Sequence, residues 1–249
     1  MKVTRNIIAA AGFVAVASFA HAGYFADFES FSSGQRLQGI DGWKGWDNVS
    51  KVAGLVSKSV AYESDRSVMI SGIAQSSTDA VKQIAGATSG AWSVSAMQYL
   101  GGNQKGSTYF ILMNKYADGK NNNAASWSTQ LRFDLAAGRV YDDYRGGSVA
   151  ISTNAWASIR VDIDLTANTV KHFYNEMLIS QGTWTRGGAS ANALAAINLY
   201  TGAKNVAYYD NVTVSSASEL SSAARVPTQG AFVTMAVAGL IAMPRRRRK

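Results

Sequence analysis

The sequence predicts an all-β domain built as a two-sheet antiparallel sandwich. Apolar residues alternate with polar ones at a period of two, which is the spacing of a strand with one buried face. The alternating segments are short, about a dozen in number, and are separated by Gly, Asn, Ser and Asp, which favour turns. No convincing helical period occurs between Gly23 and Val214.

The clearest strands lie between residues 156 and 180. In residues 158–165, Ile and Val alternate strictly with Arg and Asp, so one face is buried and the other is wet. A turn at residues 166–168 leads into a second strand, 169–174, and Asn175-Glu176 makes a second turn before a third strand. Three consecutive antiparallel strands are therefore predicted.

The same alternation predicts the other strands of the domain. Trp92, Trp127 and Trp156 fit it and are interpreted as core residues. The further predicted strands are 67–71, 91–99, 107–114, 127–133, 139–141, 149–152, 195–199 and 207–214.

Residues 1–22 have the pattern of a secretory signal peptide. Lys2 and Arg5 precede an apolar stretch, and Ala20-His21-Ala22 forms a small-residue cleavage site. We therefore expect an exported protein whose mature chain begins at Gly23.

The C-terminal segment, residues 226–249, has three parts. Val226, Pro227, Thr228, Gln229 and Gly230 form a short motif, an apolar stretch from 231 to 243 predicts a short hydrophobic helix, and four arginines and a lysine close the chain. The apolar stretch is at the low edge of what crosses a bilayer, and the cations would remain on the cytoplasmic side. Residues 215–225, rich in Ser and Ala, predict a flexible linker.

This segment resembles the PEP-CTERM sorting signal of Gram-negative bacteria. The resemblance implies recognition and removal by an exosortase-type membrane protease, contact with the inner membrane, and delivery to the cell envelope, the cell surface or the extracellular matrix. Of the Pro-Glu-Pro motif only Pro227 is present, since Thr228 and Gln229 occupy the next positions. The alternative is that the segment persists as a weak membrane anchor.

The two ends also account for the basic character of the chain. The formal net charge is +8, but seven of the 24 Lys and Arg residues lie in 1–22 and 245–249. The remaining 17 Lys and Arg residues are nearly balanced by 16 Asp and Glu residues, so the domain is almost neutral. Nucleic acid is therefore not expected as a partner. The chain has no cysteine, and a domain of this size needs no disulfide.

Residues 23–214 resemble laminin-G-like and concanavalin-A-like jelly rolls. The resemblance lies in the strand opened by Trp156, in His172-Phe173-Tyr174-Asn175, and in Tyr208-Tyr209-Asp210-Asn211-Val212 near the C-terminal end of the domain. It implies a jelly-roll sandwich in a secreted bacterial protein.

Catalytic patterns are sparse. Enzymes on the resembled fold line up three acids on one strand, and this chain has only four glutamates, none in such a row. Asp162 and Asp164 share one strand face about 7 Å apart, but alternate with core residues beside Arg160, which favours a solvated surface. His172 is the only histidine after the signal and lies within a strand, so a Ser-His-Asp triad is not favoured.

One metal hypothesis and three binding candidates remain. Asp27, Glu29 and Asp210 lie at the two ends of the domain, where such jelly rolls often hold a structural Ca²⁺, and their hard oxygen atoms suit this ion. For binding, aromatic rings can stack on the apolar faces of sugars. The candidates are Trp43 and Trp46 in a Gly-rich segment, Tyr144 and Arg145 in an acidic loop, and Trp184 near Arg186; the alternative for each is closure of the core.

The sequence thus favours a non-catalytic, exported surface or matrix protein whose sandwich binds polysaccharide or packs in the matrix, with no required cofactor. The alternative is a carbohydrate-active enzyme, a glycoside hydrolase or lyase, on the same fold.

Overall fold

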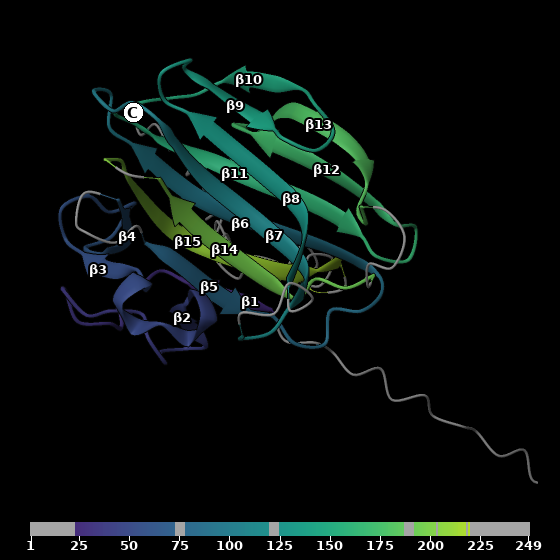
Figure 1. Cartoon of the computed structure of the whole chain (residues 1–249), viewed down its shortest axis with the longest axis horizontal. Coiled ribbons are helices and arrows are strands. Elements are labelled where there is room, and N and C mark those ends of the chain that lie inside the picture. The colour runs from purple at the N-terminus through teal and green to yellow at the C-terminus, as the bar shows by residue number, and fades with distance from the viewer. Residues whose placement is uncertain are drawn as a thin grey trace, which may run out of the picture.

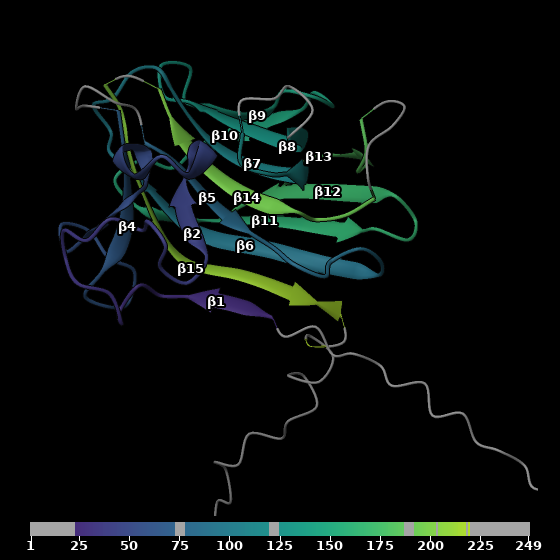
Figure 2. The same cartoon turned by 60° about the horizontal axis from the view of Figure 1, so that its bottom comes forward.

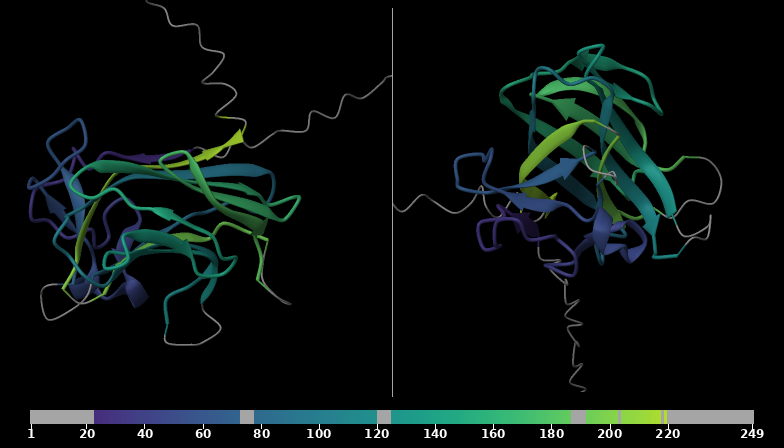
Figure 3. Two further views of the ribbon diagram at one scale, coloured as in Figure 1. Left: turned by 90° about the horizontal axis from the view of Figure 1, so that it is seen from above. Right: turned by 60° about the vertical axis from the view of Figure 1, so that its left-hand side comes forward.

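The computed structural model describes residues 23–72, 78–119, 125–186, 192–202, 204–217 and 219. The predicted signal peptide (1–22) and sorting segment (226–249), including its expected helix, lie outside the described residues. In the described part, fifteen strands and two 3₁₀ turns form an all-β, two-sheet antiparallel sandwich, which confirms the predicted fold class. Figure 1 shows the strands of one sheet crossing in front of the other, and the left panel of Figure 3 shows the two layers from the side.

The eight-stranded sheet has the order β13-β12-β11-β6-β15-β4-β3, with β1 paired to β15. Its strands are β1 (Tyr24–Ala26), β3 (Leu55–Ser57), β4 (Ser67–Ser71), β6 (Ala91–Leu100), β11 (Trp156–Asp164), β12 (Thr169–Tyr174), β13 (Met177–Thr183) and β15 (Val206–Ser216). The predicted meander of three strands is confirmed as β11-β12-β13.

The seven-stranded sheet has the order β10-β9-β8-β7-β14-β5-β2. Its strands are β2 (Trp43–Gly45), β5 (Asp79–Gln83), β7 (Ser107–Tyr116), β8 (Ala125–Asp134), β9 (Arg139–Asp142), β10 (Ser148–Ala150) and β14 (Ala196–Thr201). The 3₁₀ turns η1 (Trp46–Asn48) and η2 (Ser50–Val52) follow β2. The strands β1, β2, β3 and β5 were not predicted. Strands β1, β2 and β3 have only three residues each, and β5 does not alternate, because its two apolar residues, Ala80 and Val81, are adjacent and both buried.

The core lies between the two sheets, as alternation requires. On β11, Ile159, Val161 and Ile163 are buried, whereas Arg160 and Asp162 between them point outward. The facing strands contribute Phe110, Leu112, Leu131 and Phe133 from β7 and β8. The inner faces are therefore occupied by packed side chains, and ligands can reach only the outer faces and loops.

Two of the three tryptophans predicted as core are not in it. Trp92 is buried at 7% exposure, but Trp127 and Trp156 are half-buried on outer faces. Trp156 faces outward with Arg160 and Asp162 because it shares their parity. Trp127 faces outward because the register of β7 and β8 shifts beside it, so that Trp127 and Thr129 point to opposite faces despite their spacing of two.

The two ends of the described domain meet. Strand β1 pairs with β15, as Figure 2 shows, and the backbone N–H of Gly23 donates to the carboxylate of Glu219. Strand β15 continues to Ser216, two residues beyond the predicted end of the domain. Among the described residues, no helix is long and apolar enough to cross a membrane.

Replacing Trp184, which is fully buried, tests the packing of the core. We expect Trp184→Ala to lower the free energy of unfolding of the full chain by about 3–5 kcal/mol, because it empties a large buried volume. Leu178→Ala is the control, since that side chain is 47% exposed and should change stability by roughly 0.5 kcal/mol or less. Urea unfolding measures both, and equal losses would contradict the packing described.

Candidate functional site

Two residues predicted to bind ligand belong to the core instead. Trp43 and Trp184 are both 0% exposed. The Trp43 Nε1–H donates to the Tyr24 hydroxyl at 2.6 Å, and the Trp184 Nε1–H donates to the carbonyl of Ala193 at 3.0 Å. Their predicted role in binding was wrong, because these rings close the sandwich and leave no face for a sugar.

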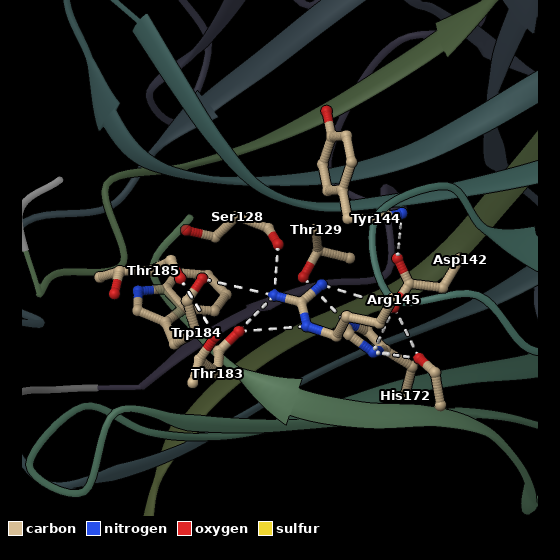
Figure 4. Close-up of polar contacts among 10 residues, drawn as sticks. Ser128, Thr129, Asp142, Tyr144, Arg145, His172, Thr183, Trp184 and Thr185 are labelled. Atoms are coloured by element: carbon tan, nitrogen blue, oxygen red, sulfur yellow. Dashed lines mark hydrogen bonds and ion pairs between the residues drawn. The ribbon is translucent and has the colours of Figure 1, made fainter. Parts of the chain in front are cut away.

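Arg145 is also a structural residue. Its side chain is only 10% exposed, and its Nη2 donates to the carbonyls of Ser128 at 2.8 Å and Thr183 at 2.6 Å (Figure 4). Its Nη1 lies 3.4 Å from Oδ2 of Asp142, which is also buried. Arg145 therefore joins strands β8, β9 and β13, and the prediction that it binds ligand was wrong.

A buried histidine lies beside this ion pair. His172 Nε2 is 2.9 Å from the Thr129 hydroxyl, and its Nδ1 is 2.9 Å from the Ser180 hydroxyl and 3.4 Å from Asp142 Oδ2 (Figure 4). Burial lowers the pKa of His172 to about 4, against the opposing effect of Asp142 and with a further lowering by Arg145. Hydroxyl, imidazole and carboxylate lie together as in a nucleophilic site.

This cluster, however, is closed to any substrate. Thr129 and His172 are 0% exposed and Asp142 is 2% exposed. Thr129 and Asp142 belong to the seven-stranded sheet, whereas His172 and Ser180 belong to the other. The cluster is therefore a polar link between the sheets, and sequence alone could not reveal it, because its members come from four separate strands.

The residues of the calcium hypothesis have protein partners. Glu29 accepts from the backbone of Arg66 at 2.6 Å and pairs with its guanidinium, and Asp210 accepts from the backbone of Tyr62 at 2.9 Å. Burial, together with the charges of Glu29 and Asp27, raises the pKa of Asp210 to about 6, although two backbone N–H donors oppose this. Within the described ranges, no group of three or more His, Asp or Glu side chains could hold a metal ion.

Asp162 and Asp164 make structural contacts on the outer face of the eight-stranded sheet. Asp162 accepts from the Ser93 hydroxyl at 3.0 Å and pairs with Arg160. Asp164 accepts from the backbone N–H groups of Thr166 and Ala167 at 2.9 and 2.8 Å, which closes the turn after β11. A hollow of about 520 Å³ adjoins them, but both oxygens of Asp162 and Oδ1 of Asp164 are committed to structural contacts.

A cluster of aromatic side chains lies on the outer face of the seven-stranded sheet. Trp46 in η1 stacks against Trp127 on β8, with ring centroids 5.8 Å apart and planes within 13°. Tyr109 and Tyr200, opposite each other on β7 and β14, form a second pair at 5.5 Å. A hollow of about 250 Å³ lies on this face, and we call it the aromatic groove; its lining is Trp46, Asp79, Ile111, Trp127, Asn198 and Tyr200.

Polar groups are fixed at the floor of the aromatic groove. The Asn198 amide donates to Asp79 Oδ1 at 2.6 Å. Burial raises the pKa of Asp79 to about 6, and the nearby charge of Asp47 adds to this, whereas the bond from Asn198 opposes it. The groove thus combines flat apolar rings with an amide and a carboxyl group that can accept or, below pH 6, donate a hydrogen bond.

Only some of the predicted residues lie on this face. Trp46 lines the groove, and the hydroxyl of Tyr144 donates to Gln130, the residue opposite Ile111 of the groove. The ring of Tyr144 is covered by Arg186, whose guanidinium carbon lies 3.4 Å from the ring centroid. The sequence analysis missed four other groove residues, Trp127, Tyr200, Asp79 and Asn198. Trp127 reaches this face because of a register shift between β7 and β8, which a single sequence does not reveal.

The buried histidine makes stability depend on pH. Because the pKa of His172 is lower in the folded chain than its ordinary 6.5, the unfolded chain takes up a proton first, and stability is lost as pH falls from about 6.5 to 4. Asp79 and Asp210, whose pKa values are raised to about 6, act in the opposite direction over this range.

We therefore expect the stability difference between wild type and His172→Gln to shrink by on the order of 2–3 kcal/mol between pH 7 and 4. Urea unfolding at several pH values measures this, and a constant difference would refute the assignment.

Comparison with known proteins supports the fold. No known family model matches the chain, and no curated protein matches it. A solved sialidase structure aligns with 80% of this chain at 13% identity and a TM-score of 0.55, although the aligned part is only 19% of the sialidase chain. An endo-β-1,4-glucuronan lyase from the fungus Trichoderma reesei aligns over 78% of this chain and 94% of its own, at 11% identity and a TM-score of 0.50. The globular domain of T. cruzi calreticulin aligns over 73% and 86%, at 9% identity and a TM-score of 0.50. At these identities the chain shares a fold with these proteins.

Proposed function

We propose that this chain is a carbohydrate-binding protein whose ligand lies in the aromatic groove. The observation that carries the proposal is the stacked pair Trp46 and Trp127 beside the amide and carboxyl of Asn198 and Asp79. The C–H faces of a sugar can lie on the indole rings, while its hydroxyls bond to the planar polar groups. The fold shared with a glucuronan lyase and a sialidase, whose names refer to glycans, is consistent with this ligand class.

The breadth of the site favours a polymer over a single sugar. Apart from Trp46 in η1, the groove residues come from β5, β14, β7 and β8, four neighbouring strands that span about 14 Å at the usual strand spacing. Tyr109 continues the aromatic surface beside Tyr200, and Arg132 follows opposite Tyr109 on β8. A polysaccharide crossing the strands would therefore contact several rings.

We further propose that the protein is exported and acts at the cell surface or in the matrix. The support is the sequence: a secretory signal at 1–22 and a segment at 226–249 that resembles a sorting signal. On this proposal an exosortase-type protease in the inner membrane removes the segment. Mass spectrometry of the C-terminus of the protein from its native cell tests this, and an intact Lys249 would show that the segment is retained.

A glycan-cleaving enzyme is the second candidate, and Asp79 is the observation that favours it. A carboxyl with a pKa raised to about 6 in a groove, with the charge of Asp47 nearby, has the properties of a general acid. Against it, the Asp79 oxygen is held by Asn198, and Asp47 accepts from the backbone of Gly119 at 3.1 Å. We favour binding, because both carboxylates have structural partners.

Replacing one indole tests the binding site. We expect Trp127→Ala to weaken the affinity of the full chain for polysaccharide about tenfold or more, because a stacked ring contributes roughly 1.5–3 kcal/mol. The control is Leu178→Ala, at a large apolar residue of β13 in the opposite sheet that is 47% exposed. Isothermal titration with soluble xylan, hydroxyethylcellulose and alginate measures the affinities, and similar losses in both variants would refute the site.

Replacing the carboxyl distinguishes binding from catalysis. On the binding proposal, the full chain releases no reducing ends or unsaturated ends from these polymers, and Asp79→Asn changes affinity only. Product formation by the wild type that Asp79→Asn abolishes would establish the enzyme instead. Both are measured by end-group assay over time, with melting temperature confirming that the variant is folded.

A further inference from the structure

The outer face of the eight-stranded sheet carries a second aromatic surface. Trp156, Tyr99 and Tyr208 lie opposite one another on β11, β6 and β15, and their neighbouring ring centroids are 5.8 and 6.3 Å apart. Tyr62, from the loop before β4, places its ring edge-on to Trp156 at 5.7 Å. All four are half-buried, so this row is part of the molecular surface.

An exposed phenylalanine stands near this row. Phe25 on β1 is 59% exposed, the most exposed of the large hydrophobic side chains in the described chain. It lies opposite Thr213 of β15, which in turn lies opposite Ser95 of β6. Its neighbour Ala26 packs into the core, so alternation directs Phe25 to the outer face.

A hollow of about 370 Å³ joins Phe25 to Tyr62. Its floor is formed by short hydroxyl side chains and Met97, and its rim by amide and charged groups. Its lining includes Phe25, Tyr62, Ser95, Met97, Ser158 and Asn211. We call this hollow the second site.

The chemistry of the second site suits a carbohydrate. Two aromatic rings at its margins offer apolar faces, while Ser95, Ser158 and Asn211 supply hydroxyl and amide groups for sugar hydroxyls. Arg160 at the rim is paired with Asp162 and Glu176, so the site has no strong unbalanced charge. An extended peptide is disfavoured, because β6 and β15 in the floor are paired on both sides, and β1, the edge strand that carries Phe25, offers a free backbone edge of only three residues.

The two sites lie on opposite outer faces of the sandwich. The aromatic groove is on the seven-stranded sheet and the second site is on the eight-stranded sheet, with the packed core between them. Two packed sheets are about 10 Å apart, so a sugar at one site cannot touch the other. Figure 2 shows the strands of the two sheets as separate layers, with β1 and β15 far from β8 and β9.

We infer that the second site, formed around Phe25 and Tyr62, is a further carbohydrate-binding site, and that one molecule thereby bridges two polysaccharide chains. The inference rests on the proposed function of the aromatic groove. A monomer with one site per face would act as a cross-linker in a matrix, without oligomerisation.

The experiment compares single-site variants of the full chain. Phe25→Ser combined with Tyr62→Ala disables the second site, Trp127→Ala disables the aromatic groove, and Met177→Ser, at an exposed residue of β13, is the surface control. Each is tested for binding by titration and for cross-linking by viscosity and sedimentation of xylan, hydroxyethylcellulose and alginate. Light scattering reports the mass of the protein, and melting temperature reports its folding.

We expect wild type and Met177→Ser to bind and cross-link the same polymer. Each single-site variant should bind one polymer chain, about half the wild-type stoichiometry, and lose cross-linking. The inference is overturned if the Phe25→Ser/Tyr62→Ala variant cross-links like wild type, if a dimer accounts for bridging, or if Trp127→Ala alone removes all binding. The last result would leave the proposed function intact, whereas no binding by wild type to any of the polymers would reject both.

Discussion

The buried carboxylate of Asp142 is the constraint around which one end of the sandwich is arranged. A charge removed from water costs several kcal/mol unless it is paired and hydrogen-bonded. Here Oδ2 accepts from the Ser180 hydroxyl at 2.6 Å and lies 3.4 Å from Arg145 Nη1, and Oδ1 accepts from the backbone of Tyr144 at 2.9 Å. Because Ser180 belongs to the opposite sheet, satisfying this one group ties the sheets together and shapes the loop after β9.

Because these polar side chains are bonded to one another inside the sandwich, they are not available to bind a ligand. The histidine, the arginine and the acids that most resemble catalytic groups are bonded to one another or to backbone, and His172 and Asp142 are out of reach of solvent. The outer faces, in contrast, carry half-buried rings. On the seven-stranded sheet, Trp46, Trp127, Tyr109 and Tyr200 pack against a second, smaller apolar cluster. On one face two indoles are stacked nearly parallel, and on the other the rings meet at 59° to 70°. The outer faces are therefore the surfaces that can bind a ligand, and variants on each face can be tested separately.

The sequence predicted the fold well where strands are long and alternate strictly. The predicted strand at 91–99 agrees with the ten-residue β6 to within one residue, and the pattern of Ile159, Val161 and Ile163 identified the buried face of β11. It failed where geometry is set by pairing partners. The register shift beside Trp127 reverses the face of that ring, and β5 does not alternate, because its two apolar residues, Ala80 and Val81, are adjacent and both buried. Since β5 carries Asp79, the groove could not be assembled from sequence, and of the predicted binding residues only Trp46 lines it. Trp43 and Trp184 were misassigned because a tryptophan next to glycines in a loop looks the same whether it closes a core or meets a ligand.

The central claim is that carbohydrate lies against Trp46 and Trp127. The chain has six tryptophans, and the indole N–H of each gives a resolvable signal in a two-dimensional nitrogen-proton NMR spectrum. During titration with xylan, hydroxyethylcellulose or alginate oligosaccharides, we expect the signals of Trp46 and Trp127 to shift, while those of the buried Trp43 and Trp184 stay in place. Saturating shifts confined to other tryptophans, or no shift at Trp46 and Trp127 with a bound ligand, would contradict it.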